Sequence, residues 1–302
     1  MTALKLKALP ASNPRVRGRA KDSKTKSQKE EQSFKAPPLM KPGRDYMLNL
    51  PKGYLSNSQI ELYLRCPAQY EFKYVQGQRQ TEKFYFLEGN AIGKAMETTC
   101  NAFMDTGVHL TLKQAISVQR SFVAKGAKDV EDWEEHSPSD LKARGKTMLT
   151  NFWESGYLPK LRPVERDGRS GAEHKLVGKI AGVPFLGFID LLEETVVTDF
   201  KVSNNPRKRY NAQKSLQLAL YGMMTKMNKA RYLTWSRKTC LFDEIGPVSL
   251  PLAKTKKWVD RVVSNVAYGI SKGSFPVTNP SADYLCDERW CSYWGKCYGA
   301  SK

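Results

Sequence analysis

The sequence predicts an α/β fold in which a mixed central sheet is flanked by helices. Two short apolar runs, residues 185–192 and 196–202, are separated only by a small polar turn. β-Branched and aromatic runs with this spacing are typical of two adjacent strands. Apolar residues at helical spacing occur on both sides of the runs, at residues 89–104 and 254–271. We therefore expect a sheet covered by helices.

Composition divides the 302 residues into a tail and one folded domain. Residues 1–45 are rich in Lys, Arg, Ser and Pro and nearly lack aromatic residues, so they cannot bury enough surface to fold. We expect a disordered basic tail there and a single domain at residues 46–302. Within that domain we expect a helical part at about 54–160, the sheet and its helices at about 161–275, and a cysteine cluster at 286–297.

The formal net charge of +19 predicts a polyanionic partner, with nucleic acid ahead of a membrane surface. No apolar run is long enough to span a membrane, and no signal-peptide core follows Met1. Six cysteines in a chain of this length do not resemble a secreted disulfide scaffold, which favours a reducing compartment. We expect the cytoplasm of a bacterium or of a phage-infected host, with an organelle matrix as the minor alternative.

The first helix is expected to begin at a capping box formed by Ser58 and Glu61, with Leu64 on its apolar side. Pro67 ends this helix because proline lacks a backbone amide, and a second short helix follows. The remaining elements are expected in this order: helices at 89–104, 112–127 and 141–155, a polar loop at 162–178, a strand near 180–184, the two strands above, a helix at 215–224, strands at 231–235 and 241–242, and a helix at 254–271 with an apolar stripe of Trp258, Val262, Val266 and Ile270.

Three charged residues lie inside the two adjacent strands, where charge is normally avoided. Asp190 lies in the first strand, and Asp199 and Lys201 lie in the second. Side chains alternate along a strand, so Asp199 and Lys201 share a face, and Asp190 reaches that face if the strands pair. Burying charge is costly unless it is paired or bound to a metal ion. The pattern predicts hydrolytic chemistry on a phosphate, or else an ion pair that does no chemistry.

The segment after these strands is polar and basic. Its residues Arg207, Lys208, Arg209 and Tyr210 are suited to phosphate contact and base stacking, although a solvated basic loop is the alternative. Further along, Gln217 and Tyr221 lie four residues apart and therefore on one face of a helix.

Four cysteines are candidates for a metal site, because Cys66 precedes Pro67 and three more lie in a region dense in aromatic residues. These four are Cys66, Cys286, Cys291 and Cys297, which leaves Cys100 and Cys240 outside. Four thiolates bind Zn²⁺ or an iron–sulfur cluster. Zinc sites usually come as two close pairs, which this spacing does not form.

In their order along the chain, these residues resemble the RecB-like branch of the PD-(D/E)xK nucleases. The pattern is most similar to the iron–sulfur exonucleases related to the nuclease domain of AddB and to the CRISPR-associated adaptation nucleases, over about residues 54–297. The matching motifs are a short helix ending in Cys-Pro (residues 56–67), G-x-I-D (187–190), [DE]-x-K (199–201), Q-x-x-x-Y (217–221) and the four cysteines.

The resemblance implies a PD-(D/E)xK restriction-endonuclease-like core and a metal-dependent DNA exonuclease that acts on single-stranded ends, 5′→3′, in recombination, repair or phage DNA replication. It implies Mg²⁺ or Mn²⁺ held by Asp190, Asp199 and the Phe200 carbonyl. Lys201 would orient or deprotonate the attacking water. Gln217 and Tyr221 would hold the DNA backbone or Lys201. A [4Fe–4S] cluster, or alternatively Zn²⁺, would join Cys66 to the three later cysteines as a clasp.

Two departures from the family pattern leave a second function open. The family's early helix carries G-x-x-x-H, whose His is a metal ligand, but here that position holds Gly93. Glu97, one turn later, or a water would have to replace it. Four residues separate Cys286 from Cys291, where relatives often have two. The alternative is a catalytically inactive DNA-binding partner of a helicase, recombination protein or integration complex, with any motor on a separate chain because no G-x-x-x-x-G-K-[ST] motif occurs.

Overall fold

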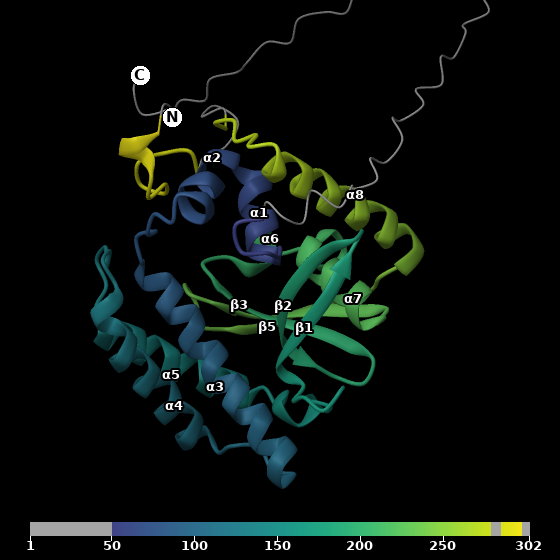
Figure 1. Cartoon of the computed structure of the whole chain (residues 1–302). Coiled ribbons are helices and arrows are strands. Elements are labelled where there is room, and N and C mark those ends of the chain that lie inside the picture. The colour runs from purple at the N-terminus through teal and green to yellow at the C-terminus, as the bar shows by residue number, and fades with distance from the viewer. Residues whose placement is uncertain (1–49, 279–284, 298–302) are drawn as a thin grey trace, which may run out of the picture. The chain divides into compact units, whose positions relative to one another are not determined.

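Figure 1 shows the computed structural model, which describes residues 50–278 and 285–297. All of these residues belong to a unit that extends from Leu39 to Lys302. The predicted tail at residues 1–45 lies outside the described residues, so its disorder stays a prediction. Within the described part of the chain, no helix combines the length and the apolar character that crossing a membrane requires.

Five strands form one mixed sheet in the order β1-β2-β3-β4-β5. Only β3 and β4 run parallel; the other neighbouring pairs are antiparallel. Parallel neighbours need a crossover connection, which here contains α6 (Pro206–Arg209) and α7 (Leu216–Thr225). The α/β fold with a mixed sheet is therefore as predicted. The strands are β1 (Ala172–Ile180), β2 (Val183–Leu192), β3 (Val196–Ser203), β4 (Lys229–Ser236) and β5 (Phe242–Ser249).

The first strand corrects the sequence prediction. The loop predicted at 162–178 is wrong from Ala172 onward, because β1 begins there. The strand predicted near 180–184 is interrupted by the turn at 181–182, which joins the end of β1 to the start of β2. Side chains alternate along β1, with His174 buried and Lys175 exposed. An edge strand of an antiparallel pair has one solvated face, so polar residues are tolerated there. The polar residues of β1 are the reason why the sequence predicts a loop there.

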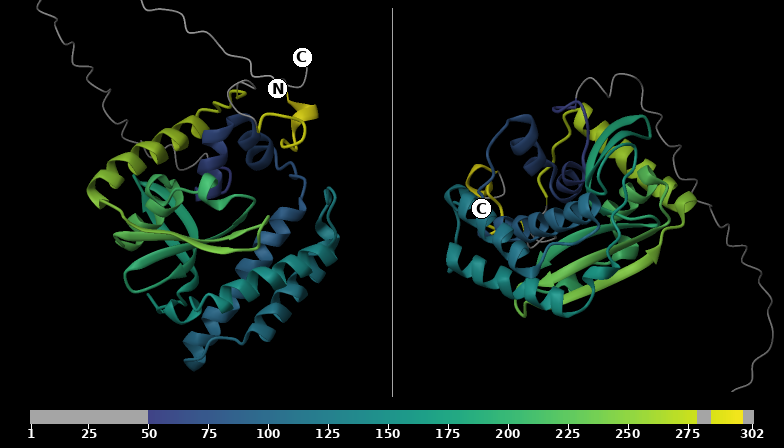
Figure 2. Two further views of the ribbon diagram at one scale, coloured as in Figure 1. Left: turned by 180° about the vertical axis from the view of Figure 1, so that it is seen from behind. Right: turned by 90° about the horizontal axis from the view of Figure 1, so that it is seen from below.

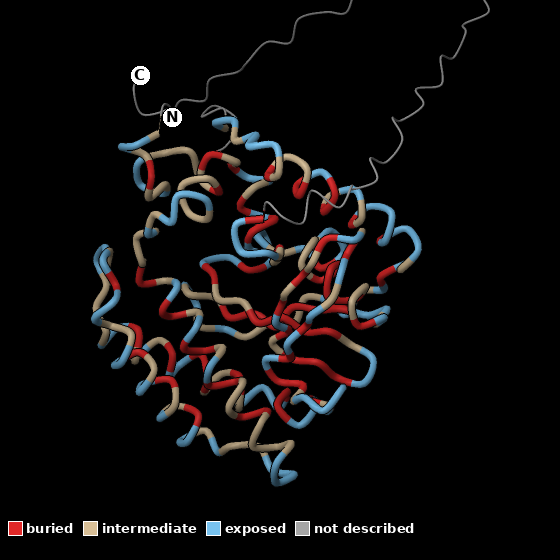
Figure 3. Tube along the Cα trace, in the orientation of Figure 1, coloured by how far each residue is buried: buried red, intermediate tan, exposed pale blue. Residues whose placement is uncertain are grey.

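Three helices pack side by side on one face of the sheet, as Figure 1 shows. Their inward side chains join Leu233 and Trp235 of β4 in a buried cluster, which is red in Figure 3. All three helices are predicted correctly, although the first begins at Phe84 and not at Gly89. They are α3 (Phe84–Thr106), α4 (Leu112–Gly126) and α5 (Pro138–Glu154).

The opposite face is covered by α1 (Asn57–Arg65), α7 and α8 (Leu252–Ser271), which Figure 2 shows from behind and from below. The apolar stripe predicted for α8 is wrong in part. Val259 and Val263 are fully buried, whereas Trp258 is 42% exposed and is turned away from the core. Val266 and Ile270 are buried as predicted, so the error concerns the first half of the stripe.

The predicted start of α1 is also corrected. The side chain of Ser56 accepts a hydrogen bond from the backbone amide of Gln59, so Ser56 is the N-cap and Ser58 lies inside the helix. Leu64, expected on the apolar side, is 54% exposed. The predicted break at Pro67 is confirmed, since Pro67 opens a separate short helix, α2 (Pro67–Tyr70).

Segment 285–297 packs against the chain that follows α2, beside which it is drawn in yellow in Figure 1. The ammonium of Lys83 donates a hydrogen bond to the Arg289 carbonyl at 2.8 Å. The Tyr293 hydroxyl donates to the Gln78 carbonyl at 3.2 Å, and the Tyr293 ring stacks on Phe72 with centroids 5.3 Å apart. Residues distant in sequence thus form one wall of the molecule.

Candidate active site

Three charged side chains meet on neighbouring strands of the sheet. The register of β2 and β3 pairs Leu191 with Thr198, and extending it by one residue places Asp190 opposite Asp199. The Lys201 ammonium lies 2.6 Å from Asp199 Oδ2 as an ion pair. Asp190 Oδ2 accepts a hydrogen bond from the Phe200 amide at 2.5 Å. The predicted convergence of the three side chains is therefore found in the structure.

The two carboxylates are held close together in a poorly solvated place. Burial raises the pKa of Asp199, which the Lys201 ammonium opposes. Burial and then the negative charge of Asp199 raise the pKa of Asp190 well above its usual range. Burial by itself would lower the pKa of Lys201, but Asp199 and Asp190 outweigh it and raise the pKa above its usual range. Lys201 is thus an ammonium at neutral pH.

The oxygen atoms of this site suit a divalent cation. Asp199 is fully buried, and its Oδ1 has no hydrogen-bond partner among the described residues. The N–H and C=O of one strand residue point to the same edge, so the Phe200 carbonyl lies on the side of Asp190. In the described ranges no three His, Cys, Asp or Glu side chains are grouped as a metal site. Mg²⁺ needs fewer, because it keeps several waters and binds through one or two carboxylates.

The charged residues lie in a cleft of about 1800 Å³ between the sheet, α1 and α3. Pockets for small ligands measure roughly 300–1,000 Å³, so this cleft fits a polymer better than a metabolite. Six basic side chains besides Lys201 line it and can contact the phosphates of a polyanionic strand. They are Arg65, Lys94, Lys208, Arg209, Lys214 and Arg237, and four carboxylates besides Asp190 and Asp199 also line the cleft.

Comparison with known families identifies the fold. The family model described as the PD-(D/E)XK nuclease superfamily matches residues 54–298. The chain belongs to the PD-(D/E)XK nuclease superfamily. Its Asp190, Asp199 and Lys201 thus form the candidate active site of a nuclease.

Two solved structures are similar to this nuclease at the level of the chain trace, each with 11% sequence identity. One is titled "Putative exonuclease", from Eubacterium rectale; the match covers 77% of this chain and 86% of that one, with a TM-score of 0.46. The other is titled SSO0001; it covers 80% and 92%, with a TM-score of 0.33. The comparison with curated proteins gives no match.

The nuclease holds Gln217 and Tyr221 together on α7. Gln217 Nε2 donates a hydrogen bond to the Tyr221 hydroxyl at 3.2 Å. Gln217 lines the cleft, whereas Tyr221 is buried behind it, and burial together with the charge of Asp199 raises its pKa. A Cβ on Gly187 would come within 3.1 Å of the Tyr221 ring, which explains the glycine there. Gln217 is therefore the member of the pair that a substrate in the cleft can reach.

The α3 helix presents Gly93 and Glu97 to the cleft. A Cβ at Gly93 would meet no atom within 4 Å, so the position that holds His in the family pattern is open space here. Glu97 forms an ion pair with Lys94 at 2.7 Å. Burial raises the pKa of Glu173 on β1, and the charges of Glu97 and Asp199 add to the rise. Glu97 thus lies near the paired carboxylates.

Of the basic segment predicted to contact nucleic acid, residues 207–210, three residues line the cleft and one does not. The segment forms the short helix α6, whose first turn is capped by the Asn205 side chain accepting from the Lys208 amide. Lys208, Arg209 and Tyr210 line the cleft. Arg207 instead forms an ion pair with Asp243 on β5 and does not line the cleft, because β5 presents a carboxylate beside it.

Three of the four candidate cysteines lie near one another. Cys291 Sγ accepts a hydrogen bond from Gln69 Nε2 at 3.1 Å. Burial raises the pKa of the Cys291 thiol, and interaction with Cys66 and Cys297 contributes. Cys286 Sγ lies 3.9 Å from the Thr278 carbonyl. Cys100 is fully buried in the core, as expected for a thiol outside the cluster.

Sequence reasoning missed two residues beside the carboxylates. Glu61 of α1 interacts with Lys201 and Asp199, and burial raises its pKa. Tyr232 of β4 pairs in register with Asp199, and it shares a short hydrogen bond with Ser215 at 2.5 Å. Burial raises the Tyr232 pKa. The alternation within the predicted strand 231–235 could have placed Tyr232 on this face, whereas nothing in the sequence signals Glu61.

Proposed function

We propose that this nuclease is a metal-dependent deoxyribonuclease that hydrolyses phosphodiester bonds from single-stranded ends. The observation that carries the proposal is the cluster of Asp190, Asp199 and Lys201 inside a long cleft lined by basic side chains. Hydrolysis from ends, with 5′→3′ direction, rests on the resemblance to RecB-like exonucleases. Roles in recombination, repair or phage DNA replication, in the cytoplasm, rest on the same resemblance.

The donor set supports Mg²⁺ or Mn²⁺ as the cofactor. Asp190, Asp199 and the Phe200 carbonyl would hold the ion, with Glu97 as a further candidate, and the unpartnered Asp199 Oδ1 is the atom best explained by it. When bound, such an ion polarises a phosphate and acidifies a water.

The side chains divide the remaining work between them. Lys201 is an ammonium, because the two carboxylates raise its pKa. We assign it stabilisation of negative charge on the reacting phosphate and orientation of the water. Gln217 is placed to hold the strand, and Tyr221 to hold Gln217.

The function is tested by digestion of single strands labelled at the 5′ or the 3′ end, with Mg²⁺, Mn²⁺ or EDTA. We expect progressive shortening from one end that EDTA abolishes and excess Mn²⁺ restores, because the carboxylates cannot position a water without a cation. Duplex DNA of the same sequence should be cut more slowly. Strands that bind but stay intact in every metal would contradict hydrolysis.

That outcome would favour the second candidate, a catalytically inactive DNA-binding partner of a helicase or recombination protein. The observation that favours it is the open space at Gly93, where the family pattern has a metal-binding His.

We also propose that Cys66, Cys286, Cys291 and Cys297 hold a [4Fe–4S] cluster, with Zn²⁺ as the alternative. Support comes from the mutual interaction of Cys66, Cys291 and Cys297 and from the packing of segment 285–297 on the chain after α2. Four thiolates from two distant segments fit the ligand requirement of such a cluster.

Anaerobically purified protein is expected to be brown and to contain iron and sulfide, because four thiolates ligate the cluster. Cys291→Ser should lose most of the iron, whereas Cys240→Ser, a cysteine outside the set, should keep it. Visible absorption and metal analysis measure both. A colourless wild type that contains zinc would overturn the iron assignment.

A further inference from the structure

The lining of the cleft includes aromatic rings and an arginine that the proposed chemistry does not use. Tyr85 and Phe86 of α3, Arg237 after β4 and Trp290 of segment 285–297 line it, and we name these four residues the aromatic–arginine subsite. Eleven residues of α3 separate Phe86 from Glu97, which lies near the carboxylates. At a rise of 1.5 Å per residue the separation is about 16 Å.

The rings of the subsite are exposed although they are large and apolar. Phe86 is 37% exposed and Trp290 is 42% exposed. The rings of Tyr85 and Phe86 lie 4.6 Å apart. Lys83 holds Trp290 in place. Its ammonium donates a hydrogen bond to the carbonyl of the neighbouring Arg289 and lies 5.9 Å from the centroid of the Trp290 ring. Exposed rings in a basic cleft are the surface on which unpaired bases stack.

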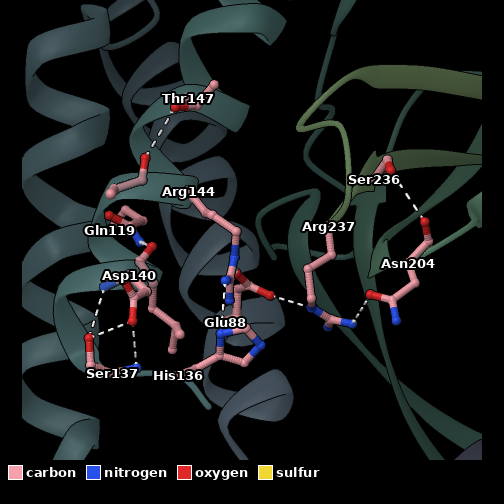
Figure 4. A network of polar contacts seen from close by, with 12 residues as sticks. Glu88, Gln119, His136, Ser137, Asp140, Arg144, Thr147, Asn204, Ser236 and Arg237 are labelled. Atoms are coloured by element: carbon pink, nitrogen blue, oxygen red, sulfur yellow. Dashed lines mark hydrogen bonds and ion pairs between the residues drawn. The ribbon is translucent and has the colours of Figure 1, made fainter.

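The arginine of the subsite is held by a buried carboxylate (Figure 4). Glu88 is fully buried, and its two oxygens accept hydrogen bonds from Arg144 Nε at 2.7 Å and from Arg237 Nε at 2.5 Å. Arg237 Nη1 also donates to Asn204 Oδ1 at 3.3 Å. Among the described residues, Arg237 Nη2 has no hydrogen-bond partner. Arg237 is thus fixed in position with one donor free.

The charges around Glu88 do not cancel. Two guanidinium groups share the Glu88 carboxylate, so this group of three side chains carries a net positive charge. The Arg237 guanidinium also lies 5.8 Å from the centroids of both Phe84 and Tyr85. An arginine held rigidly against rings, with a free N–H, matches a phosphate next to a stacked base.

We propose that the aromatic–arginine subsite binds one nucleotide of a single strand, with its phosphate on Arg237 and its base on Phe86 and Trp290. The inference rests on the proposed function, since it assumes that nucleic acid occupies this cleft. Bases in a duplex stack on each other and cannot reach such rings, so the subsite selects single strands. At about 3.4 Å per stacked nucleotide, 16 Å corresponds to about five nucleotides between subsite and carboxylates.

The test measures binding without cleavage, by fluorescence anisotropy of labelled 12-nucleotide strands in EDTA. Each nucleotide in turn is replaced by an abasic unit. When the abasic unit occupies one particular position of the strand, we expect the affinity of the wild type to fall about 5- to 100-fold, which is the contribution of one base stacked on an aromatic side chain. Trp290→Ala should lose a similar factor on the intact strand. Trp290→Ala should lose little further affinity when the strand carries the abasic unit at that position, since both changes remove the same contact.

Two controls accompany the test. Trp258→Ala removes an equally exposed tryptophan from another wall of the cleft and should not couple to that position. Arg120→Ala removes an exposed arginine of α4 that does not line the cleft and should bind normally. Arg237→Ala should weaken every strand. If that variant unfolds at a lower temperature, the Trp290 result alone decides.

Two results would overturn the inference. One is that the affinity losses from Trp290→Ala and from the abasic unit multiply at every position of the strand, and the other is that the wild type binds duplex DNA as tightly as a single strand. Failure of the proposed function is a separate result. A protein that cleaves strands but gives no coupling contradicts the subsite only. A protein that gives the coupling but never cleaves contradicts hydrolysis only.

Discussion

Replacing Lys201 by alanine is expected to slow digestion of single-stranded DNA by about 10²–10³-fold while strand binding is retained. The reason is electrostatic: Asp199 and Asp190 raise the Lys201 pKa and keep it an ammonium 2.6 Å from Asp199. A fixed positive charge beside the phosphate stabilises the negative charge that develops there, and losing one such donor costs a factor of this size. Initial rates at saturating strand and Mn²⁺ measure the effect.

The matched control is Lys179→Ala, which removes an exposed lysine of β1 outside the cleft and should keep the wild-type rate. Thermal unfolding of both variants is needed, because removing Lys201 leaves two carboxylates without their cation. A folded Lys201→Ala protein that digests strands as fast as the wild type would show that the ammonium takes no part in hydrolysis.

Replacing Asp190 by asparagine is expected to abolish digestion and yet to stabilise the metal-free fold at pH 8. Burial, followed by the charge of Asp199, raises the Asp190 pKa in the folded protein. Folding therefore becomes less favourable as pH rises from the unfolded pKa of about 4 through the folded pKa, and the full loss is present above it. Asparagine carries no charge and can still accept the Phe200 amide, so it avoids that loss.

At pH 8 in EDTA we expect a gain in unfolding free energy for Asp190→Asn, because burial raises the Asp190 pKa in the folded protein. The gain should vanish at about pH 3, below the unfolded pKa of about 4, where the wild-type carboxyl is protonated in both states. Urea denaturation at the two pH values measures it, and Asp105→Asn, an exposed aspartate of α3, is the control. Mn²⁺ should raise the melting temperature of the wild type and not of Asp190→Asn. An equal rise in both would contradict the ligand assignment.

The strands that carry the site could be predicted from sequence because alternation and a short turn leave few options. Asp199 and Lys201 two residues apart must share a face, and pairing across the turn brings Asp190 beside them. Strand β1 could not be predicted in the same way, because an edge strand with a solvated face has the composition of a loop. Trp258 was assigned to the core since helical spacing alone leaves an uncertainty of one residue in rotation.

The aromatic–arginine subsite was beyond prediction for a different reason. Glu88, Arg144 and Arg237 lie on separate elements, and only the packed fold brings two guanidinium groups to one carboxylate. No local pattern marks Glu88, which reads as an ordinary polar residue near the start of a helix. The ion pair of Arg207 with Asp243 was likewise beyond prediction, because Asp243 lies on β5, far from Arg207 in the sequence.

The hydrogen bond from Lys83 to the Arg289 carbonyl can form only late in translation. These two residues are 206 positions apart, so a ribosome adding about 5–20 residues per second needs roughly 10–40 s to pass from one to the other. In the later part of that interval, after Lys201 has been translated, the chain carries the carboxylates and the lysine, but Trp290 has not been translated. The nascent chain therefore lacks the proposed stacking contact between a base and Trp290 until translation is nearly complete.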